Sequence, residues 1–394
     1  MQNKIVISLS LLFCFTYPGI QHILIDYLNV YFVKFFSLFF LLIQFKYYKD
    51  FFTFSYNKKF FFLISFMFLY KFFYSPFSDI KDLTIFLNLI WVFLLFISIK
   101  TNDQFQFFLK ALFLTSSLVV ISAGIDNIFD LNRNFFIRSY VENNSLTGFT
   151  NSYIVYSLCS LQCLFLSIYF YRRSNGYSRF FYLFLIFASL FASITSGSRG
   201  SALVAVLSLS FYFVMSVKIN NKKLFSVKHI YSLIFLLIIS SFVLPYEVLL
   251  NEFSRIFEGN DLSASRRLSA GLVSLNSFYE NPLFGSGWGY TRQIIGIPSH
   301  SMILQLLGEL GILGLFLEFS IYFLIFKLCY NLYISPVVVK QETQFLFLST
   351  VTLAFGIFIW CFFENLGFVF GDRIIYTNVI ILFLIYKIYF YRKI

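Results

Sequence analysis

Long apolar runs separated by short polar stretches fill nearly the whole chain. A helix needs about 20 apolar residues to cross a bilayer, and by that measure the pattern predicts about twelve transmembrane helices. The predicted spans are residues 5–21, 28–45, 60–75, 83–99, 106–124, 149–170, 180–195, 201–217, 229–246, 301–326, 344–363 and 374–391. We therefore expect an all-α polytopic protein in which residues 1–394 form a single membrane domain.

Two longer polar stretches stand apart from the short loops, at residues 125–148 and 247–300. Each follows an odd-numbered span, so both are expected on one face of the membrane. In the second loop, apolar residues recur at helical spacing at Leu268, Leu272, Leu275 and Tyr279. This spacing predicts a short amphipathic helix lying on or near the membrane.

The ends of that amphipathic helix are predicted from its flanking residues. Ser263 or Ser265 can cap its start, which would place Arg266 and Arg267 in its first turn. Pro282 is expected to end it, and the following "GSGWG" forms a loop of small residues that a substrate could approach. Two positive charges at the positive end of a helix dipole favour a bound anion.

Composition supports a membrane protein, since 59% of the residues are hydrophobic and only 12% are charged. The net charge of +12 does not require a nucleic-acid partner, because cytoplasmic loops of membrane proteins are enriched in lysine and arginine. The basic loops all fall on one side if both termini are cytoplasmic: Lys46, Lys49, Lys58 and Lys59; Arg172, Arg173 and Arg179; Lys218, Lys222, Lys223 and Lys228; Arg392 and Lys393.

The opposite, external side is rich in arginine, against that rule. Arginine presents a rigid fork of donors that suits phosphate and carboxylate, whereas lysine is a point charge. The external arginines are Arg133, Arg138, Arg199, Arg255, Arg266, Arg267, Arg292 and Arg373. Their number suggests an anionic ligand on this face, with scattered surface arginine as the alternative.

The stretch "SITSGSRGSALVAVLSL" at residues 193–209 offers a first anion site. Its serines and glycines predict a tight external turn, with Arg199 in the first turn of the helix that follows. Unpaired N–H groups and the positive dipole end favour an anion there. An interfacial arginine that binds lipid headgroups is the alternative.

The stretch "IPSHSMILQLLGELG" at residues 297–311 offers a base. Pro298 bars a helix before it, Ser299 is a plausible N-cap, and His300 would start the tenth span. A helix start near arginines disfavours the imidazolium, and a neutral imidazole is what a general base needs. His22 and His229 lack such neighbours and are interpreted as interfacial histidines.

Glu309 lies inside the same predicted span, where an ionisable residue is a functional candidate. Gly308, Gly311 and Gly314 flank it and predict a face for close helix contact. A structural hydrogen-bonding role and a catalytic role both remain open for Glu309. Arg292 and Arg373 are further possible helpers.

No metal site or cofactor is predicted. The five cysteines lie in apolar segments, and no histidine or acidic residue joins Cys159 and Cys163 to complete a ligand set. The sequence has no D-x-D pair, H-E-x-x-H, G-x-S-x-G or P-loop.

Taken together, these stretches resemble the bacterial O-antigen polymerase and O-antigen ligase superfamily. The family's Ser-Arg-Gly turn matches "SGSRG" at Arg199, and its arginine about fifteen residues before "nPl-G-G-G" matches Arg267. Its pattern "H-N-x-x-L-x-x-x-x-E-x-G-x-x-G" matches "HSMILQLLGELGILG" from His300. The resemblance covers roughly residues 190–320. It departs at Ser301, where the family has Asn, and at Gly271, where Trp is frequent.

The resemblance implies a metal-independent, inverting glycosyl transfer from a polyprenyl-pyrophosphate-linked oligosaccharide. In that picture His300 deprotonates the acceptor hydroxyl, while Arg199 and Arg267, or Arg266, hold the pyrophosphate. A repeat-unit polymerase for O-antigen or capsule in the bacterial inner membrane is the leading hypothesis. Its pathway would include a flippase and a chain-length regulator. An O-antigen ligase, a lipid-linked oligosaccharide flippase and an anion transporter follow as alternatives.

Overall fold

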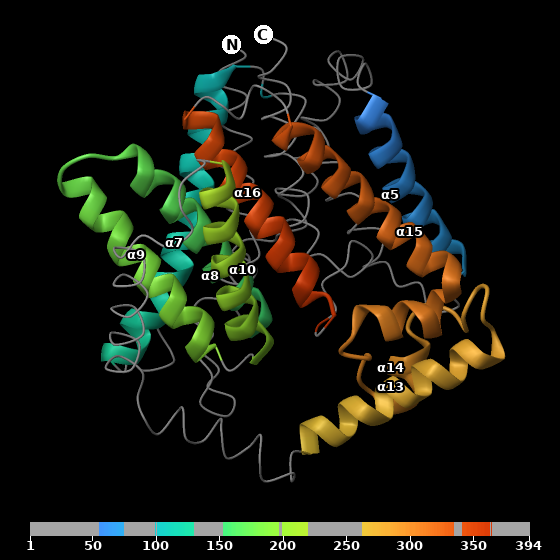
Figure 1. Cartoon of the computed structure of the whole chain (residues 1–394). Coiled ribbons are helices and arrows are strands. Elements are labelled where there is room, and N and C mark those ends of the chain that lie inside the picture. Colours follow the sequence, from blue (N-terminus) through green and yellow to red (C-terminus); the bar gives the residue numbers. More distant parts are fainter. Residues whose placement is uncertain are drawn as a thin grey trace, which may run out of the picture. The chain divides into compact units, whose positions relative to one another are not determined.

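The computed structural model describes residues 55–74, 99, 101–129, 153–196, 199–219, 262–334, 341–362 and 364. Every regular element in these ranges is an α-helix (Figure 1), which confirms the all-α prediction for the described part of the chain. The helices are α5 (Ser55–Tyr74), α7 (Asn102–Phe129), α8 (Tyr153–Arg173), α9 (Tyr177–Thr195), α10 (Arg199–Ile219), α13 (Leu262–Glu280), α14 (Tyr290–Ile295), α15 (Met302–Tyr333) and α16 (Gln341–Trp360).

Seven of the predicted spans coincide with helices, namely α5, α7, α8, α9, α10, α15 and α16. Four of these are long and apolar enough to cross a membrane, in the segments Asp103–Ser122, Ile154–Arg173, Tyr177–Ile194 and Met302–Tyr333. The spans predicted at 5–21, 28–45, 83–99, 229–246 and 374–391 lie outside the described residues, apart from Ile99. The total of twelve therefore stays a prediction, as does a single membrane domain over the whole chain.

The described helices divide between two compact units. The α15 unit contains α5, the start of α7 to Thr115, α13 from Ala264, α14, α15 and the end of α16 from Ile357. The α8 unit contains the rest of α7, α8, α9, α10 and α16 to Gly356.

The α8 unit is built from continuous helices with small polar residues between them. Its buried positions include many serines, and several donate to the carbonyl four residues earlier in their own helix. Ser160 Oγ donates to Tyr156 O at 2.9 Å, and Thr350 Oγ1 to Leu346 O at 2.7 Å. Small residues of this kind let membrane helices approach closely.

In the α15 unit, α5 runs beside α15, and α14 packs near the N-terminal end of α15 (Figure 1). The long helix α15 is not continuous, because Gly311 adopts φ 65° and ψ −165° inside it. The loop that follows α13, residues 281–289, fills the break and replaces the missing helical hydrogen bonds. The replacements are Ile312 N–H to Pro282 O (3.0 Å), Leu313 N–H to Leu283 O (3.3 Å), Ser286 N–H to Gly308 O (2.9 Å) and Gly287 N–H to Glu309 O (2.9 Å).

The place where the loop at 281–289 passes through the break in α15 is called the crossing here, and glycine is required on both sides of it. A Cβ at Gly311 would lie 2.4 Å from the carbonyl carbon of Leu283, and one at Gly285 would lie 2.5 Å from that of Glu309. The predicted face for close packing is confirmed at Gly308, where a Cβ would lie 2.6 Å from Ser274 O of α13. At Gly311 the prediction is wrong, since this residue breaks the helix instead of packing it.

The amphipathic helix predicted in the large loop is α13, and it ends two residues before Pro282. The capping prediction is wrong, because α13 already begins at Leu262 and both Ser263 and Ser265 lie inside it. Arg266 and Arg267 therefore fall in the second turn, further from the positive end of the dipole than expected.

Helix α13 exposes apolar side chains and buries small polar ones, which is the reverse of an amphipathic helix in a soluble protein. Leu268, Leu272 and Tyr279 are 67%, 52% and 77% exposed, whereas Ser274 and Ser277 on the opposite face are buried. This arrangement suits a helix whose apolar face meets lipid. Its contact with the membrane stays a prediction.

Candidate active site

His300 stands just before the first turn of α15. The predicted N-cap at Ser299 is wrong by two residues, because α15 begins at Met302 and Ser301 occupies the N-cap position in an extended conformation. No serine side chain caps the helix. Instead, the Met302 N–H donates to Cys361 O at the end of α16, at 3.2 Å. The end of α16 thus meets the start of α15 beside His300.

The imidazole of His300 pairs with the carboxylate of Glu364, which lies four residues after the end of α16. Glu364 Oε2 lies 3.1 Å from Nδ1, and only 5% of the Glu364 side chain is exposed. An ionised carboxylate can only accept hydrogen bonds, so Nδ1 is the donor of this pair. In the neutral ring Nε2 then carries the lone pair, which is the tautomer that a base acting through Nε2 needs.

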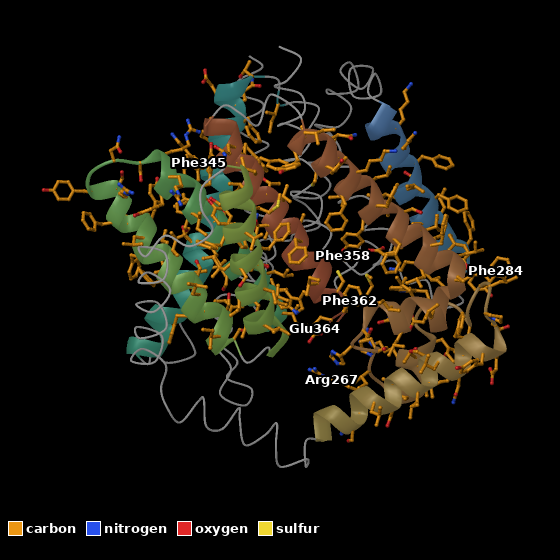
Figure 2. All side chains as sticks on the ribbon, viewed as in Figure 1. Arg267, Phe284, Phe345, Phe358, Phe362 and Glu364 are labelled. Atoms are coloured by element: carbon orange, nitrogen blue, oxygen red, sulfur yellow. The ribbon has the colours of Figure 1, made fainter. Side chains whose placement is uncertain are left out.

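Arg267 of α13 reaches the same carboxylate. Its Nη2 lies 4.0 Å from Glu364 Oε1, which makes an ion pair without a close hydrogen bond. The side chain is 41% exposed, so further guanidinium N–H groups are accessible to a ligand. Figure 2 labels Arg267 and Glu364 at this point. The structure thus brings two predicted site residues, His300 and Arg267, to one buried acid.

Sequence reasoning missed Glu364. It lies one residue beyond the predicted span 344–363, at the end expected on the same face as His300. An acidic residue at such a position, in the apolar run "IWCFFENLGF", is uncommon and was the available signal. Its pairing with His300 spans 64 residues, and no local pattern encodes it.

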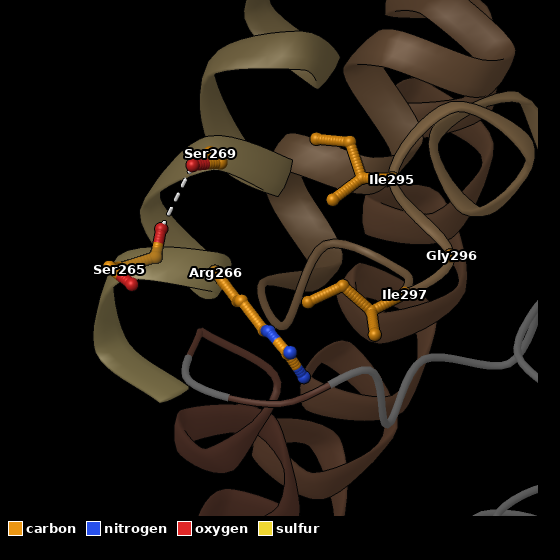
Figure 3. A pocket seen from close by; sticks show the side chains of 6 residues that line it. All are labelled: Ser265, Arg266, Ser269, Ile295, Gly296 and Ile297. Atoms are coloured by element: carbon orange, nitrogen blue, oxygen red, sulfur yellow. Dashed lines mark hydrogen bonds between the residues drawn. The ribbon is translucent and has the colours of Figure 1, made fainter. Parts of the chain in front are cut away.

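The two neighbouring arginines of α13 point to different surroundings. Arg267 faces Glu364, whereas Arg266 lines a cavity between the start of α13 and the segment after α14 (Figure 3). The structure therefore separates two residues that the sequence left interchangeable.

Glu309 is fully buried and binds the loop that crosses α15. Its Oε2 accepts hydrogen bonds from the Gly289 N–H at 2.9 Å and from Gln305 Nε2 at 3.2 Å. Thr291 provides a further hydrogen bond. These contacts support the structural role that the sequence left open, namely holding the end of the loop against α15.

Residues of α5, which the sequence analysis did not identify, form hydrogen bonds to the loop at 281–289 and to the break in α15. Tyr70 Oη donates to Leu310 O at 3.0 Å, at the break in α15, and also lies 3.2 Å from Phe284 O. Tyr74 Oη donates to Gly285 O at 3.0 Å. The ammonium of the buried Lys71, on the same helix, lies 4.0 Å from the centroid of the Trp288 ring.

Arg199 begins α10 in the α8 unit, as predicted. Serines fix the backbone on either side of it, since Ser201 Oγ donates to Ser193 O at 2.6 Å and lies 3.0 Å from Ser196 Oγ. Its anion-binding role stays a prediction. Arg292 is exposed on α14, and Arg373 lies outside the described residues.

Within the described residues, no group of three histidine, cysteine or acidic side chains could hold a metal ion. Comparison with known families finds a match over the middle of the chain. The profile of the Wzy_C family, O-antigen ligase, matches residues 183–319, which run from α9 into α15. This segment includes Arg199, Arg266, Arg267 and His300, whereas Glu364 and α5 lie outside it. No curated protein matches the chain.

Proposed function

We propose that the chain, whose residues 183–319 match the O-antigen ligase family, polymerises lipid-linked oligosaccharide repeat units of an O-antigen or capsule. The donor is an oligosaccharide on polyprenyl pyrophosphate, and the acceptor is a sugar hydroxyl of a second lipid-linked glycan. One observation carries this proposal: a buried carboxylate, Glu364, that contacts both a histidine and an arginine.

The reaction uses His300 as a general base. Nε2 takes the proton of the acceptor hydroxyl while the hydroxyl oxygen attacks the anomeric carbon of the donor sugar. The bond from that carbon to the pyrophosphate oxygen breaks, and polyprenyl pyrophosphate leaves with the bonding electron pair. Attack opposite the leaving group inverts the anomeric configuration. The proton then passes from the imidazole to water.

Arg267 and Arg199 stabilise the leaving group. Negative charge builds on the pyrophosphate as the bond breaks, and preorganised guanidinium donors lower the barrier by meeting that charge. These arginines supply counter-charge without a metal ion or cofactor. Glu364 is a positioning residue, because it holds the imidazole in one tautomer and keeps Arg267 beside it.

The proposed setting is the bacterial inner membrane, with the site on the external face and both termini cytoplasmic. The partners are the lipid-linked oligosaccharide, the bilayer, and a flippase and a chain-length regulator of the same pathway. No nucleic acid takes part. An O-antigen ligase that transfers finished glycan to lipid A–core is the second candidate, favoured by the description of the matched family.

The surface glycan of a deletion strain separates the two candidates. Loss of a polymerase leaves single repeat units attached to the core, because ligation continues. Loss of a ligase leaves no glycan attached and accumulates lipid-linked polymer. The proposal predicts the first pattern on a gel of extracted lipopolysaccharide, and the second pattern would replace it by the ligase. Accumulation of cytoplasmic-face donor with no periplasmic intermediate would instead indicate a flippase.

A further inference from the structure

A cavity of about 440 Å³ lies beside α13, apart from the contact between Arg267 and Glu364. It is lined by Ser265, Arg266, Ser269, Ile295, Gly296 and Ile297 (Figure 3). The first three come from the N-terminal turns of α13 and the others from the end of α14 and the segment that leads to His300. The volume falls in the range of small-ligand sites.

The guanidinium of Arg266 has no ion-pair partner among the described residues, whereas its neighbour Arg267 pairs with Glu364. A guanidinium at the wall of a cavity presents a fork of donors that suits an incoming anion or a set of ligand oxygens. Arg266 is exposed, and its side chain forms part of the cavity wall.

The rest of the lining supplies complementary contacts. Ser269 Oγ donates its hydrogen to Ser265 O at 3.0 Å, so its lone pairs are left to accept hydrogen bonds. Ile295 and Ile297 add apolar surface. Gly296 has φ 82°, and a Cβ at this residue would meet no atom within 4 Å, so the lining stays open there. Donors, an acceptor and an apolar wall together match a sugar ring.

We propose that this cavity is a glycan subsite that binds an acidic sugar, with Arg266 on its carboxylate or phosphate substituent. The inference rests on the proposed function, because the ligand is taken from the glycan being extended. The location supports it, since Ile297 lies three residues before His300 in the segment that leads into α15. The subsite would hold a sugar of the chain near the reacting hydroxyl, while Arg267 meets the pyrophosphate.

Binding to the full-length protein in nanodiscs of neutral phosphatidylcholine tests the subsite. The probes are a disaccharide that contains glucuronic acid, its neutral glucose counterpart, and a short-chain phosphatidylglycerol. The wild type should bind the acidic disaccharide about tenfold more tightly than the neutral one, as expected for a charge-assisted bidentate contact. Arg266→Gln should remove most of this preference, and Arg266→Lys should restore part of it.

Arg292→Gln is the matched control, because Arg292 is an exposed arginine on α14 that does not line the cavity. It should keep the preference. Equal binding of both disaccharides by the wild type, or an unchanged preference in Arg266→Gln, would overturn the proposal. Tighter binding of phosphatidylglycerol than of the acidic disaccharide, lost in Arg266→Gln, would also overturn it by assigning the cavity to a lipid headgroup.

His300→Ala separates this inference from the proposed function. The variant should bind the acidic disaccharide like the wild type yet form no polymer. Binding with wild-type polymer in His300→Ala would contradict the reaction and leave the subsite standing. Loss of the preference in Arg266→Gln alone would support the subsite independently of chain extension. The sugar composition of the native polysaccharide is a further test, because a repeat unit made only of neutral sugars would overturn the proposal.

Discussion

The α8 unit and the α15 unit satisfy the hydrogen-bonding groups of their helix backbones in different ways. In the α8 unit, backbone groups are satisfied inside continuous helices, and buried serines bond to their own helix, as Ser160 does to Tyr156. In the α15 unit, the helix is broken at Gly311, and its free groups are satisfied by the loop at 281–289 and by Tyr70 of α5.

The difference shows that local sequence is enough to predict a continuous helix but not a helix whose break is filled by distant residues. Non-helical backbone is tolerated at membrane depth only if other protein groups satisfy it. The broken helix therefore depends on residues far away in the chain, and the candidate site lies at its N-terminal end. Changes that disturb the crossing should therefore lower the stability of the folded protein more than equivalent changes in the α8 unit.

Gly311→Ala should have the largest effect, and Gly176→Ala is its matched control. Both glycines have nearly the same backbone, φ 65° and ψ −165° against φ 64° and ψ −144°, so alanine meets a similar strain of about 1–3 kcal/mol. Only at Gly311 does the added Cβ also meet backbone, whereas Gly176 has nothing within 4 Å. Gly311→Ala should prevent recovery of folded protein, measured by size-exclusion chromatography in detergent.

The control, Gly176→Ala, should give folded protein with a modestly lower Tm. If the two variants lost the same amount of folded protein, strain alone would explain both. The crossing of the loop and α15 would then not be the sensitive feature of the α15 unit.

Glu364→Ala should have the next largest effect, on activity and not on folding. Without the carboxylate, the hydrogen bond that holds the His300 tautomer is lost, and transfer should slow by about 10²-fold, the lower end of what a general base contributes. Glu364→Gln keeps an acceptor for Nδ1–H and should lose less. Rates are measured with a labelled lipid-linked donor in proteoliposomes. Equal, small losses in both variants would show that Glu364 acts only through packing.

Tyr70→Phe and Ser160→Ala should give the smallest losses of stability, and the loss should be larger for Tyr70→Phe. Tyr70 donates between elements to the break in α15, and its loss leaves a buried carbonyl without that partner, costing about 1–3 kcal/mol. Ser160 bonds within its own helix to a carbonyl that already accepts a helical N–H, so its loss should cost about 0.5 kcal/mol or less. Thermal unfolding in detergent should rank them in that order, and the reverse order would contradict the comparison.

Much of the helical pattern could be predicted from hydropathy, because a span must be apolar whatever it packs against. The prediction 180–195 falls on α9, Tyr177–Thr195, and 201–217 falls on α10, Arg199–Ile219. Candidate residues with unusual chemistry could also be found, since Arg267 and His300 stand out against an apolar chain. The structure places both at one carboxylate.

What could not be predicted depends on contacts between distant residues. Ser299 looked like a cap because serine often is one, yet the Cys361 carbonyl takes that role for α15. Gly311 looked like a packing residue, because a left-handed break and a close helix contact both select glycine. Glu364 and Tyr70 find their partners 64 and 240 residues away.

The central claim is that His300 is the base of a glycosyl transfer. Its most direct test is the rate of chain extension by purified His300→Ala in proteoliposomes, supplied with lipid-linked repeat units. His229→Ala serves as the control histidine. The account predicts normal protein yield and no product longer than one repeat unit from His300→Ala, with normal polymer from His229→Ala. Wild-type polymer lengths from His300→Ala would contradict it.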